Sequence, residues 1–586
     1  MRLRYEVSIP DPATHLFHVT VTCDPVPAGE WRWQLPGWTP GSYLIREFAR
    51  QVDDVAAVDG AGNALALTKS DKLTWRVAVP AEGAVVLRYT VYAHELTVRT
   101  SHLDTQQGLL NGTSVFMYPV GHLREPGTLH LTLPDGWRAY SGLEPAGESE
   151  SESGPQFQFR DYDELADCPI FLGTPAVQRF EVDGVSHDLV VAGGSLLDLP
   201  ELADDLARLV PHAAAVFGGV PYERYLFLLT QTDRGGGGLE HRNSAVMMLP
   251  RFLPAAERRQ RVQHLFAHEY FHAWNIKRLH PAALGPFDYT REAYTENLWL
   301  AEGGTDYYAW LLPARAGLTT AVDLLQHFGR QLHEDRWRPG RLHQSLAEAS
   351  RDAWIKFYRP DAHSPNATVS YYARGALVSW LLDLTLRDAT GGRATLDSLL
   401  REMWLRHPDG YPEEAPEALA VEMAGPALAG FFRDHVHRAG DLALGVLATI
   451  GLQYEEPAPT AGAAPFTGLA TAVQDGRLVI TQVEALSPAE RAGLAPGDEL
   501  VGWDRFRVDP LHFGDQVATW SAGQRVAIHL ARRGVLQETV LEAGAPRPDT
   551  GRLQPDPKPG ETAQQRFREW CGHPWPFPPT AAPSAS

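Results

Sequence analysis

A histidine-rich segment, HLFAHEYFHAWN at residues 264–275, carries the side chains of this sequence that are best suited to metal chemistry. His264, His268 and His272 recur every four residues and would form a stripe along one face of a helix. A helix rises about 1.5 Å per residue, so the first and last of them lie about 12 Å apart. One ion with nitrogen ligands at about 2.1 Å can therefore bind only a neighbouring pair.

Glu269 distinguishes between the two neighbouring pairs. His268, Glu269 and His272 form the HExxH pattern. In that pattern two imidazoles one helical turn apart bind zinc, and the glutamate polarises a water molecule and moves its proton. The residue after His264 is Leu265, so the other pair offers no such carboxylate. We therefore predict that His268 and His272 are zinc ligands and that His264 is a structural neighbour.

Acidic residues and glycines on either side of this motif can complete the site. In WLAEGGTDYYAW, Glu302 lies on another expected helix and can act as a third ligand that leaves one position for water. Asp306 follows four residues later on the same face and can hydrogen-bond the far nitrogen of a ligand histidine. Upstream, Gly237 and Gly238 offer bare backbone to an extended peptide, and Glu240 is placed to meet that peptide.

The composition is that of a multidomain globular protein. A chain of 586 residues exceeds one ordinary core, and its hydrophobic fraction of 44% and charged fraction of 21% are typical of folded domains. The net charge of -20 argues against nucleic acid or an anionic membrane as a partner. Cys23, Cys168 and Cys571 have no paired spacing, and neither a signal segment nor a membrane span is expected. These observations predict a cytoplasmic protein.

Changes in the hydrophobic period predict four parts. Residues 1–175 show short alternating runs between turn residues, which indicates an all-β domain. Residues 176–456 begin with strands and continue with long helical segments, so the part that contains the histidines is α+β. Residues 457–545 begin with a linker rich in proline and alanine and then alternate short strands with a short helix. Residues 546–586 form a proline-rich tail with one expected helix, ETAQQRFREWCG.

The sequence resembles the glycyl aminopeptidase family of gluzincin zinc metallopeptidases in the segments HEYFHAWNIKRLHP, GGGGLEHRNS, WLAEGGTDYYAW, SYYARGALVSWLLD and GWTPGSYLIREFAR. That family is related to the aminopeptidase N and leukotriene hydrolase group. The last of these segments, taken alone, is typical of a turn between strands. The resemblance extends to about residue 543 and implies an amino-terminal β domain, a thermolysin-like catalytic domain and a carboxy-terminal PDZ domain.

The resemblance also implies roles for individual residues. It assigns one zinc ion (Zn2+) to His268, His272 and Glu302, and proton transfer to Glu269. Glu240 of GGLEH takes the place of the glutamate that binds the substrate's α-ammonium group in the GAMEN motif, whose asparagine is absent here. The implied site is that of a metallopeptidase that recognises a free amino terminus.

Two further features follow from the resemblance. Tyr372 of YARG matches the tyrosine whose hydroxyl would donate to the oxyanion of the tetrahedral intermediate, and its neighbour Tyr371 is the alternative. The segment FTGLA, residues 466–470, would form the carboxylate-binding loop of the PDZ domain. The groove of such a domain can bind a peptide ligand as an added strand.

The predicted activity is zinc-dependent removal of amino-terminal residues from peptide substrates, with a preference for glycine and alanine. An endopeptidase or amide hydrolase would use the same zinc site on substrates without a free amino terminus. A non-catalytic scaffold would act through the PDZ groove alone, and the joint presence of HExxH, Glu302 and YARG argues against it. The sequence makes no prediction of the oligomeric state.

Overall fold

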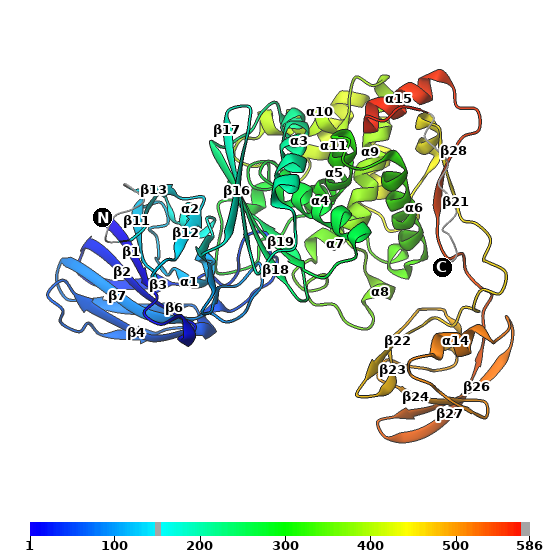
Figure 1. Cartoon of the computed structure of the whole chain (residues 1–586), viewed down its shortest axis with the longest axis horizontal. Coiled ribbons are helices and arrows are strands. Elements are labelled where there is room, and N and C mark those ends of the chain that lie inside the picture. Colours follow the sequence, from blue (N-terminus) through cyan, green and yellow to red (C-terminus); the bar gives the residue numbers. More distant parts are fainter. Residues whose placement is uncertain (147–153, 576–586) are drawn as a thin grey trace. The chain divides into compact units, whose positions relative to one another are not determined.

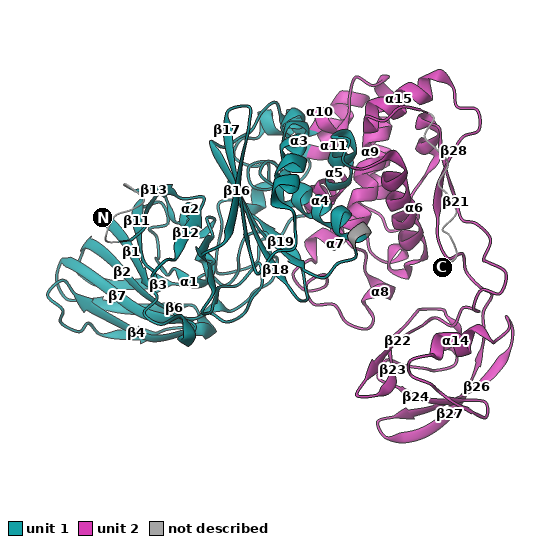
Figure 2. Ribbon diagram, in the orientation of Figure 1, with its two compact units in different colours: residues 1–295, 308–318, 400–415 teal, residues 296–307, 319–399, 416–586 magenta. Residues whose placement is uncertain are grey.

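The structure is a computed structural model, and it describes residues 1–146 and 154–575 (Figure 1). The chain forms two compact units, coloured separately in Figure 2: residues 1–295, 308–318 and 400–415 form unit 1, and residues 296–307, 319–399 and 416–586 form unit 2. Residues 147–153 of the expected β domain and residues 576–586 of the expected tail lie outside the described residues. None of the described helices is both long and apolar enough to cross a membrane.

The alternating runs near the amino terminus fold into sheets that share one apolar core. Along the first strand the side chains of Leu3, Tyr5 and Val7 are buried and their neighbours are more exposed, as the pleat of a strand requires. The largest sheet has seven strands in the order β13 (Glu144–Pro145), β14 (Gln156–Phe159), β11 (Gly127–Thr132), β1 (Arg2–Ser8), β2 (Leu16–Val26), β7 (Gly83–Tyr92) and β4 (Val52–Asp59).

Two four-stranded sheets complete this part of unit 1. One has the order β10 (Tyr118–Pro119), β3 (Gly29–Gln34), β6 (Thr74–Val79) and β5 (Leu67–Lys69), and the other has the order β12 (Arg138–Ser141), β15 (Ile170–Gly173), β9 (Gln107–Leu110) and β8 (His102–Leu103). The predicted β-rich character is confirmed, but the part is not purely β. Asn111 and Asp161 cap two short helices, α1 (Gly112–Val115) and α2 (Tyr162–Ala166), by accepting hydrogen bonds from backbone N–H groups.

A five-stranded sheet in unit 1 leads to the candidate site. Its order is β16 (Ala176–Val182), β17 (Val185–Ala192), β18 (Arg224–Thr232), β20 (Ser244–Pro250) and β19 (Gly237–Glu240). The three central strands run parallel and are almost wholly buried, which explains their continuous apolar sequences. Helix α3 (Leu199–Phe217) connects β17 with β18. The glycine run forms β19, which pairs antiparallel with β20 at the edge of the sheet.

Helices form most of the chain between residues 255 and 435. After α4 (Ala255–Phe271) and the π-helical turn η4 (Trp299–Gly303) come α5 (Gly304–Arg315), α6 (Ala321–Trp337), α7 (Leu346–Arg351), α8 (Ser364–Ala367), α9 (Ala373–Thr390), α10 (Leu396–Arg406), α11 (Ala415–Ala424) and α12 (Ala427–His435). In unit 2, η4 and α9 pack closely: a Cβ atom on Gly303 would lie 2.5 Å from the Cα atom of Gly375. Glycine at both positions permits this approach.

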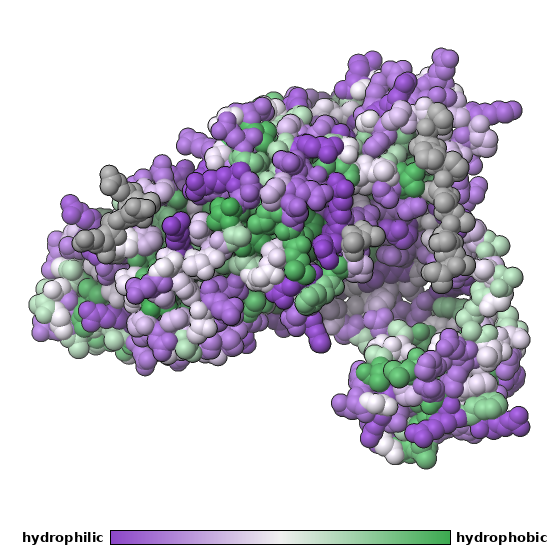
Figure 3. Space-filling view, viewed as in Figure 1, coloured by the Kyte–Doolittle hydropathy of each residue, from purple (hydrophilic) through white to green (hydrophobic). Residues whose placement is uncertain are grey.

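The residues after Pro465 form a module with a small sheet of its own. Its main strands have the order β22 (Leu469–Gln474), β23 (Arg477–Val483), β24 (Glu499–Trp503), β26 (Arg525–Arg532) and β27 (Val535–Glu542), β25 (Phe506–Arg507) pairs with β24, and the helices are α13 (Pro488–Arg491) and α14 (Phe513–Ala518). Ile480, Phe513 and Val526 belong to its separate apolar core. The module also exposes apolar side chains such as Leu511, and hydrophobic patches are visible on it in Figure 3.

The chain beyond the module packs on the helical part of unit 2. Strand β28 (Arg552–Pro555) pairs antiparallel with β21 (Leu452–Glu455), and α15 (Glu561–Cys571) follows. Phe567, Trp570 and Cys571 on one face of α15 are buried. The helix expected in the tail is therefore present and contributes to a core.

Candidate metal centre

Helix α4 places His268, Glu269 and His272 in the interior of unit 1. The helix ends at Phe271, so His272 is its C-cap. The three side chains are buried, and His268 is the most exposed of them at 8%. Phe271 stacks on Tyr308 with the ring centroids 4.4 Å apart, which holds this end of the helix against its neighbours.

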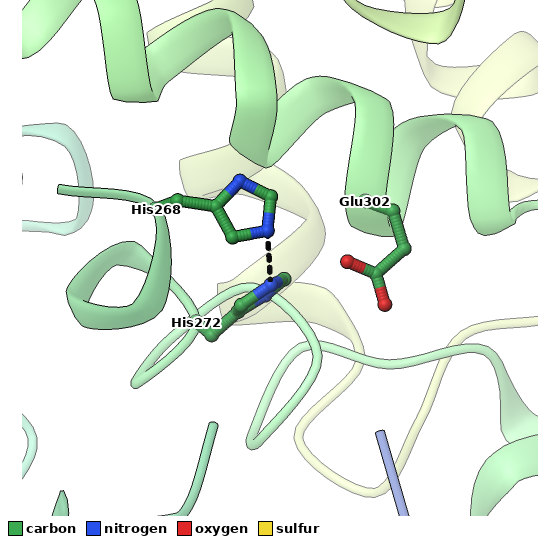
Figure 4. Close-up of side chains that lie close together, drawn as sticks. All are labelled: His268, His272 and Glu302. Carbon is green, nitrogen blue, oxygen red and sulfur yellow. Dashed lines mark hydrogen bonds between the residues drawn. The ribbon is translucent and has the colours of Figure 1, made fainter. Parts of the chain in front are cut away.

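The imidazoles of His268 and His272 face each other. Their Nε2 atoms are 3.0 Å apart, and their ring planes are at 86° (Figure 4). The Nδ1 atom of His272 donates a hydrogen bond to the carbonyl oxygen of Asn275 at 2.9 Å, which fixes the tautomer and leaves a lone pair on Nε2. Two nitrogen ligands about 2.1 Å from one tetrahedral ion lie about 3.4 Å apart, close to the observed separation.

Glu302 belongs to the same group of side chains. Its carboxylate points toward the two rings in Figure 4, and ligand atoms of His268, His272 and Glu302 all lie within 4.8 Å of one another. Two imidazoles and one carboxylate form a donor set that zinc uses in catalytic sites, so these residues fit a zinc ion. Glu302 is 1% exposed and lies in the π-helical turn η4, a type of distortion that is frequent at functional sites.

Two residues predicted to lie near the metal are on α4 and α5. The ring of His264 is 4.8 Å from the ring of Trp310 and 6.1 Å from that of His268, measured between centroids. Among the described residues, two groups of side chains could hold a metal ion, and neither includes His264. Asp306 is half-buried in α5, one helical turn after Glu302.

A second buried group joins Glu240 to the same residues. Ligand atoms of Glu240, Glu269 and His272 lie within 4.8 Å of one another. Two carboxylates this close in a buried setting would repel each other if both were charged, and a positive charge beside them would relieve that repulsion. A Cβ atom on Gly238 would lie 1.9 Å from the Oε1 atom of Glu269, so only glycine lets β19 pass this carboxylate. Its neighbour Gly237 has a φ of +129°, which also favours glycine.

Asp167 supports this second group and was missed in the sequence interpretation. Its Oδ1 atom lies 2.6 Å from Nζ of Lys277 and 3.3 Å from Nδ1 of His241, and its Oδ2 atom accepts a hydrogen bond from the Arg242 N–H at 2.9 Å. Burial alone would raise the pKa of the Asp167 carboxyl, but Lys277 and His241 hold that pKa well below its usual range. Asp167 thus ties the residue after Glu240 to the segment that follows the HExxH helix.

Tyr371 and Tyr372 lie just ahead of α9 in unit 2. Both rings pack on Phe357, with centroid distances of 4.7 Å for Tyr371 and 5.3 Å for Tyr372. Tyr371 is fully buried, whereas Tyr372 is half-buried and is the N-cap of α9. A Cβ atom on Gly303 would lie 2.5 Å from the carbonyl oxygen of Tyr371, so this segment is in direct contact with the turn that carries Glu302.

Two family models match the sequence. The Peptidase M61 N-terminal domain matches residues 4–174, and the M61 glycyl aminopeptidase model matches residues 261–378. These matches cover the β-rich part, the HExxH helix and the segment of Tyr372, and they stop before the module. No curated protein matches the sequence.

Solved structures have the same fold. The crystal structure of an aminopeptidase N family protein from Idiomarina loihiensis has a TM-score of 0.90 and 29% sequence identity, and the match covers 97% of this chain and 100% of that chain. A mutant M1 zinc metallopeptidase from Deinococcus radiodurans, bound to a Tyr-Ser-Ala substrate, has a TM-score of 0.50 and 18% identity over 76% of this chain and 95% of that chain. At that identity the second likeness concerns the fold alone.

Proposed function

We propose that this chain, a metallo-aminopeptidase whose sequence matches two peptidase M61 family models, hydrolyses the first peptide bond of peptides with a free amino terminus. One zinc ion would be held by His268, His272 and Glu302. The observation that supports this most directly is the buried group formed by these side chains, whose ligand atoms lie within 4.8 Å of one another.

Glu269 would move protons during the reaction. When bound, zinc supplies Lewis-acid chemistry, because it draws electron density from the oxygen atoms that react. The Glu269 carboxylate is buried and follows His268 directly, so it is well situated to accept a proton from the attacking water. The same group would then return the proton to the leaving amine. One residue can serve as base and acid because its protonation state changes between the two steps.

Tyr372 would stabilise the negative oxygen of the tetrahedral intermediate. Its hydroxyl can donate a hydrogen bond to an oxyanion, and such a donor commonly contributes about 3 kcal/mol to catalysis. The partial burial of Tyr372 supports this role, since its neighbour Tyr371 is fully buried. Asp306, one turn after Glu302, would hydrogen-bond a ligand histidine and hold its ring in place.

Glu240 would determine where a peptide is cut. An α-ammonium group bound beside it would neutralise the repulsion between the Glu240 and Glu269 carboxylates. The substrate backbone could add to the edge strand β19 at Gly237 and Gly238. A peptide held by its amino terminus presents only its first peptide bond to the reacting groups. We propose that glycine and alanine are the preferred first residues.

Replacing Glu240 tests this assignment. We expect Glu240→Ala to lower kcat/KM for glycyl and alanyl substrates by at least about 30-fold, because loss of one partner from a buried charge pair costs about 2–5 kcal/mol. Hydrolysis of amino-terminally acetylated peptides should be unchanged, since they carry no ammonium group. Steady-state kinetics on matched peptides with free and with acetylated amino termini measure the ratio of their kcat/KM values.

Glu240→Gln is the matched control, because it keeps the shape of the side chain and removes only its charge. It should lose most of the same selectivity. Equal preference for free and acetylated peptides in the wild type would favour the alternative function, an endopeptidase or amide hydrolase. An unchanged preference in both variants would remove Glu240 from amine recognition.

The choice of His268 and His272 as the ligand pair predicts which histidine variants keep bound zinc. We expect His264→Ala to retain about one zinc ion per chain, because its ring packs on Trp310 outside the group of ligand atoms. His268→Ala should lose bound zinc, since catalytic sites keep three protein ligands. Elemental analysis after dialysis measures both. Loss of zinc from His264→Ala with retention in His272→Ala would reverse the choice of ligands.

We propose that residues 1–175, 176–456 and 457–545 are the amino-terminal, catalytic and PDZ domains. Strand β22 lies at the edge of the sheet of the module, and a cavity of about 690 Å³ is lined by residues of the FTGLA loop, β22 and α14 together with residues of α6 and α8. A peptide could add to β22 there as an extra strand. The three cysteines are buried and widely separated in the sequence, which supports a reducing compartment such as the cytoplasm.

A further inference from the structure

The segment GWTPGSY, residues 37–43, contains a tight turn in unit 1. The Ser42 N–H donates to the Thr39 carbonyl oxygen at 3.0 Å, with Pro40 and Gly41 at the central positions. Gly41 has a φ of +89°. Proline followed by a residue with positive φ is the pattern of a type II turn, which requires glycine at the second central position. The turn type alone therefore accounts for a glycine at position 41. It does not account for the side chains that surround the turn.

Hydrogen bonds fix the position of this turn. Trp38 precedes it, is 1% exposed and donates from Nε1 to the carbonyl oxygen of Asp288 at 2.9 Å. Arg46 donates from Nη2 to the hydroxyl of Ser42 at 2.7 Å. Ser42 and Tyr43 are both buried. The turn cannot shift without breaking these bonds or opening the core around them.

The carboxylate of Glu240 lies directly against Gly41. A Cβ atom on Gly41 would lie 2.5 Å from Oε1 and 2.7 Å from Oε2 of Glu240. On other sides the Glu240 carboxylate is close to Glu269 and His272, and the side chain as a whole is 4% exposed. Although the carboxylate is the end of a flexible side chain, the fixed turn and the neighbouring site residues leave it little room to move.

We propose that Gly41 is a positioning residue for amine recognition: it confines the Glu240 carboxylate to the orientation in which that carboxylate binds the α-ammonium group of the substrate. This inference rests on the proposed role of Glu240. Any side chain at position 41 would displace the carboxylate, because contacts of 2.5 Å are far shorter than the about 3.5 Å of ordinary contacts between carbon and its neighbours. Selectivity for a free amino terminus then depends on a turn of the β-rich part.

The test compares two glycine-to-alanine variants at positions with nearly the same positive φ, +89° at Gly41 and +88° at Gly62. Gly62 has a φ of +88° in the same β-rich part, and a Cβ atom there would meet nothing within 4 Å. Gly41→Ala should raise KM for free-amine peptides at least about 10-fold with kcat changed by less than about 3-fold, the pattern of lost ground-state binding. Gly62→Ala should leave both constants unchanged. Neither variant should alter hydrolysis of acetylated peptides or zinc content.

A double-mutant cycle with Glu240→Ala separates the contact from general damage. Without the carboxylate, a methyl group at position 41 has nothing to displace, so Gly41→Ala should have no further effect on KM in that background. The melting temperature gives a second readout that does not need activity. The Gly41→Ala protein should have a lower melting temperature than the Gly62→Ala protein. The two melting temperatures should become equal when each change is combined with Glu240→Ala. This comparison remains informative even if Gly41→Ala alone folds poorly.

The outcomes distinguish this inference from the proposed function. If Glu240→Ala changes the preference for free amines and Gly41→Ala behaves like Gly62→Ala, Gly41 does not position Glu240, while the role of Glu240 stands. If Gly41→Ala has the same effect with and without the Glu240 carboxylate, it acts elsewhere and the inference is overturned. If Glu240→Ala leaves the preference unchanged, the amine role of Glu240 and the inference fall together.

Discussion

Glu269→Gln is expected to lower kcat for peptide hydrolysis by about 10²- to 10⁴-fold while the protein keeps its zinc. Glutamine has nearly the volume of glutamate, so it fits the same buried space beside Gly238. It cannot accept a proton from water at neutral pH, which removes the proposed base. The imidazoles of His268 and His272 are untouched, so metal binding should persist. Single-turnover kinetics together with elemental analysis measure the two quantities.

Glu257→Gln provides a matched control on the same helix. Glu257 lies in the first turn of α4 and pairs with Arg261 at 2.8 Å in a partly exposed ion pair, so its replacement should change neither activity nor zinc content. Glu302→Gln should lose both zinc and activity, because it changes a proposed zinc ligand, whereas Glu269→Gln should lose activity and keep its zinc. Full activity in Glu269→Gln would falsify the assignment of Glu269 as the base.

Helix α4 and the pairing of His268 with His272 could be predicted because their geometry is local. The helical repeat places side chains four residues apart on one face, so the sequence alone brings His268 and His272 together. Glu269 then selects between the overlapping histidine pairs. Glu302 lies thirty residues beyond His272, and no helical repeat reaches that far. Its grouping with the histidines was predicted from the donor chemistry of zinc and from the family resemblance.

The residues that hold the site residues in place could not be predicted from a helical repeat. Asp167 reaches His241 and Lys277 across 74 and 110 residues, and one aspartate in a turn leaves no periodic signal. The GWTPGSY segment did carry the signal of a turn, but turn chemistry does not say which side chain faces Gly41. That contact with Glu240 depends on how separate sheets pack. Sequence patterns predict elements, whereas such contacts arise only in the folded chain.

The proline-rich tail contains a helical pattern of apolar residues that its overall composition obscured. Its prolines suggested a segment with little core, yet Phe567, Trp570 and Cys571 have the spacing of one helical face. In the structure this face of α15 is buried. The indole Nε1 of Trp570 donates to the hydroxyl of Tyr307 at 2.8 Å, and that hydroxyl donates to Oδ2 of Asp383 at 2.8 Å. The tail thereby contacts the helix that follows Glu302.

Trp570→Ala is therefore expected to destabilise unit 2 by about 3–5 kcal/mol, the usual cost of removing a fully buried tryptophan. The indole is 0% exposed and stacks on Trp380 with the ring centroids 5.6 Å apart. Its loss opens a cavity beside Phe567 and leaves the Tyr307 hydroxyl without the indole N–H. Urea unfolding followed by tryptophan fluorescence or circular dichroism measures the change in midpoint.

Two variants of the same helix separate packing from hydrogen bonding and from helix propensity. Trp570→Phe keeps most of the buried ring and loses only the N–H donor, so it should cost about 1–3 kcal/mol. Arg568→Ala changes an exposed side chain of α15 and should stay within about 0.5 kcal/mol of the wild type. The expected loss of stability therefore decreases in the order Trp570→Ala, Trp570→Phe, Arg568→Ala, from lost packing and a lost hydrogen bond, through the lost hydrogen bond, to neither. If Trp570→Ala unfolded at the same urea concentration as Arg568→Ala, the tail would add nothing to the core, and Tyr307 and Asp383 would have to be held by the surrounding helices instead.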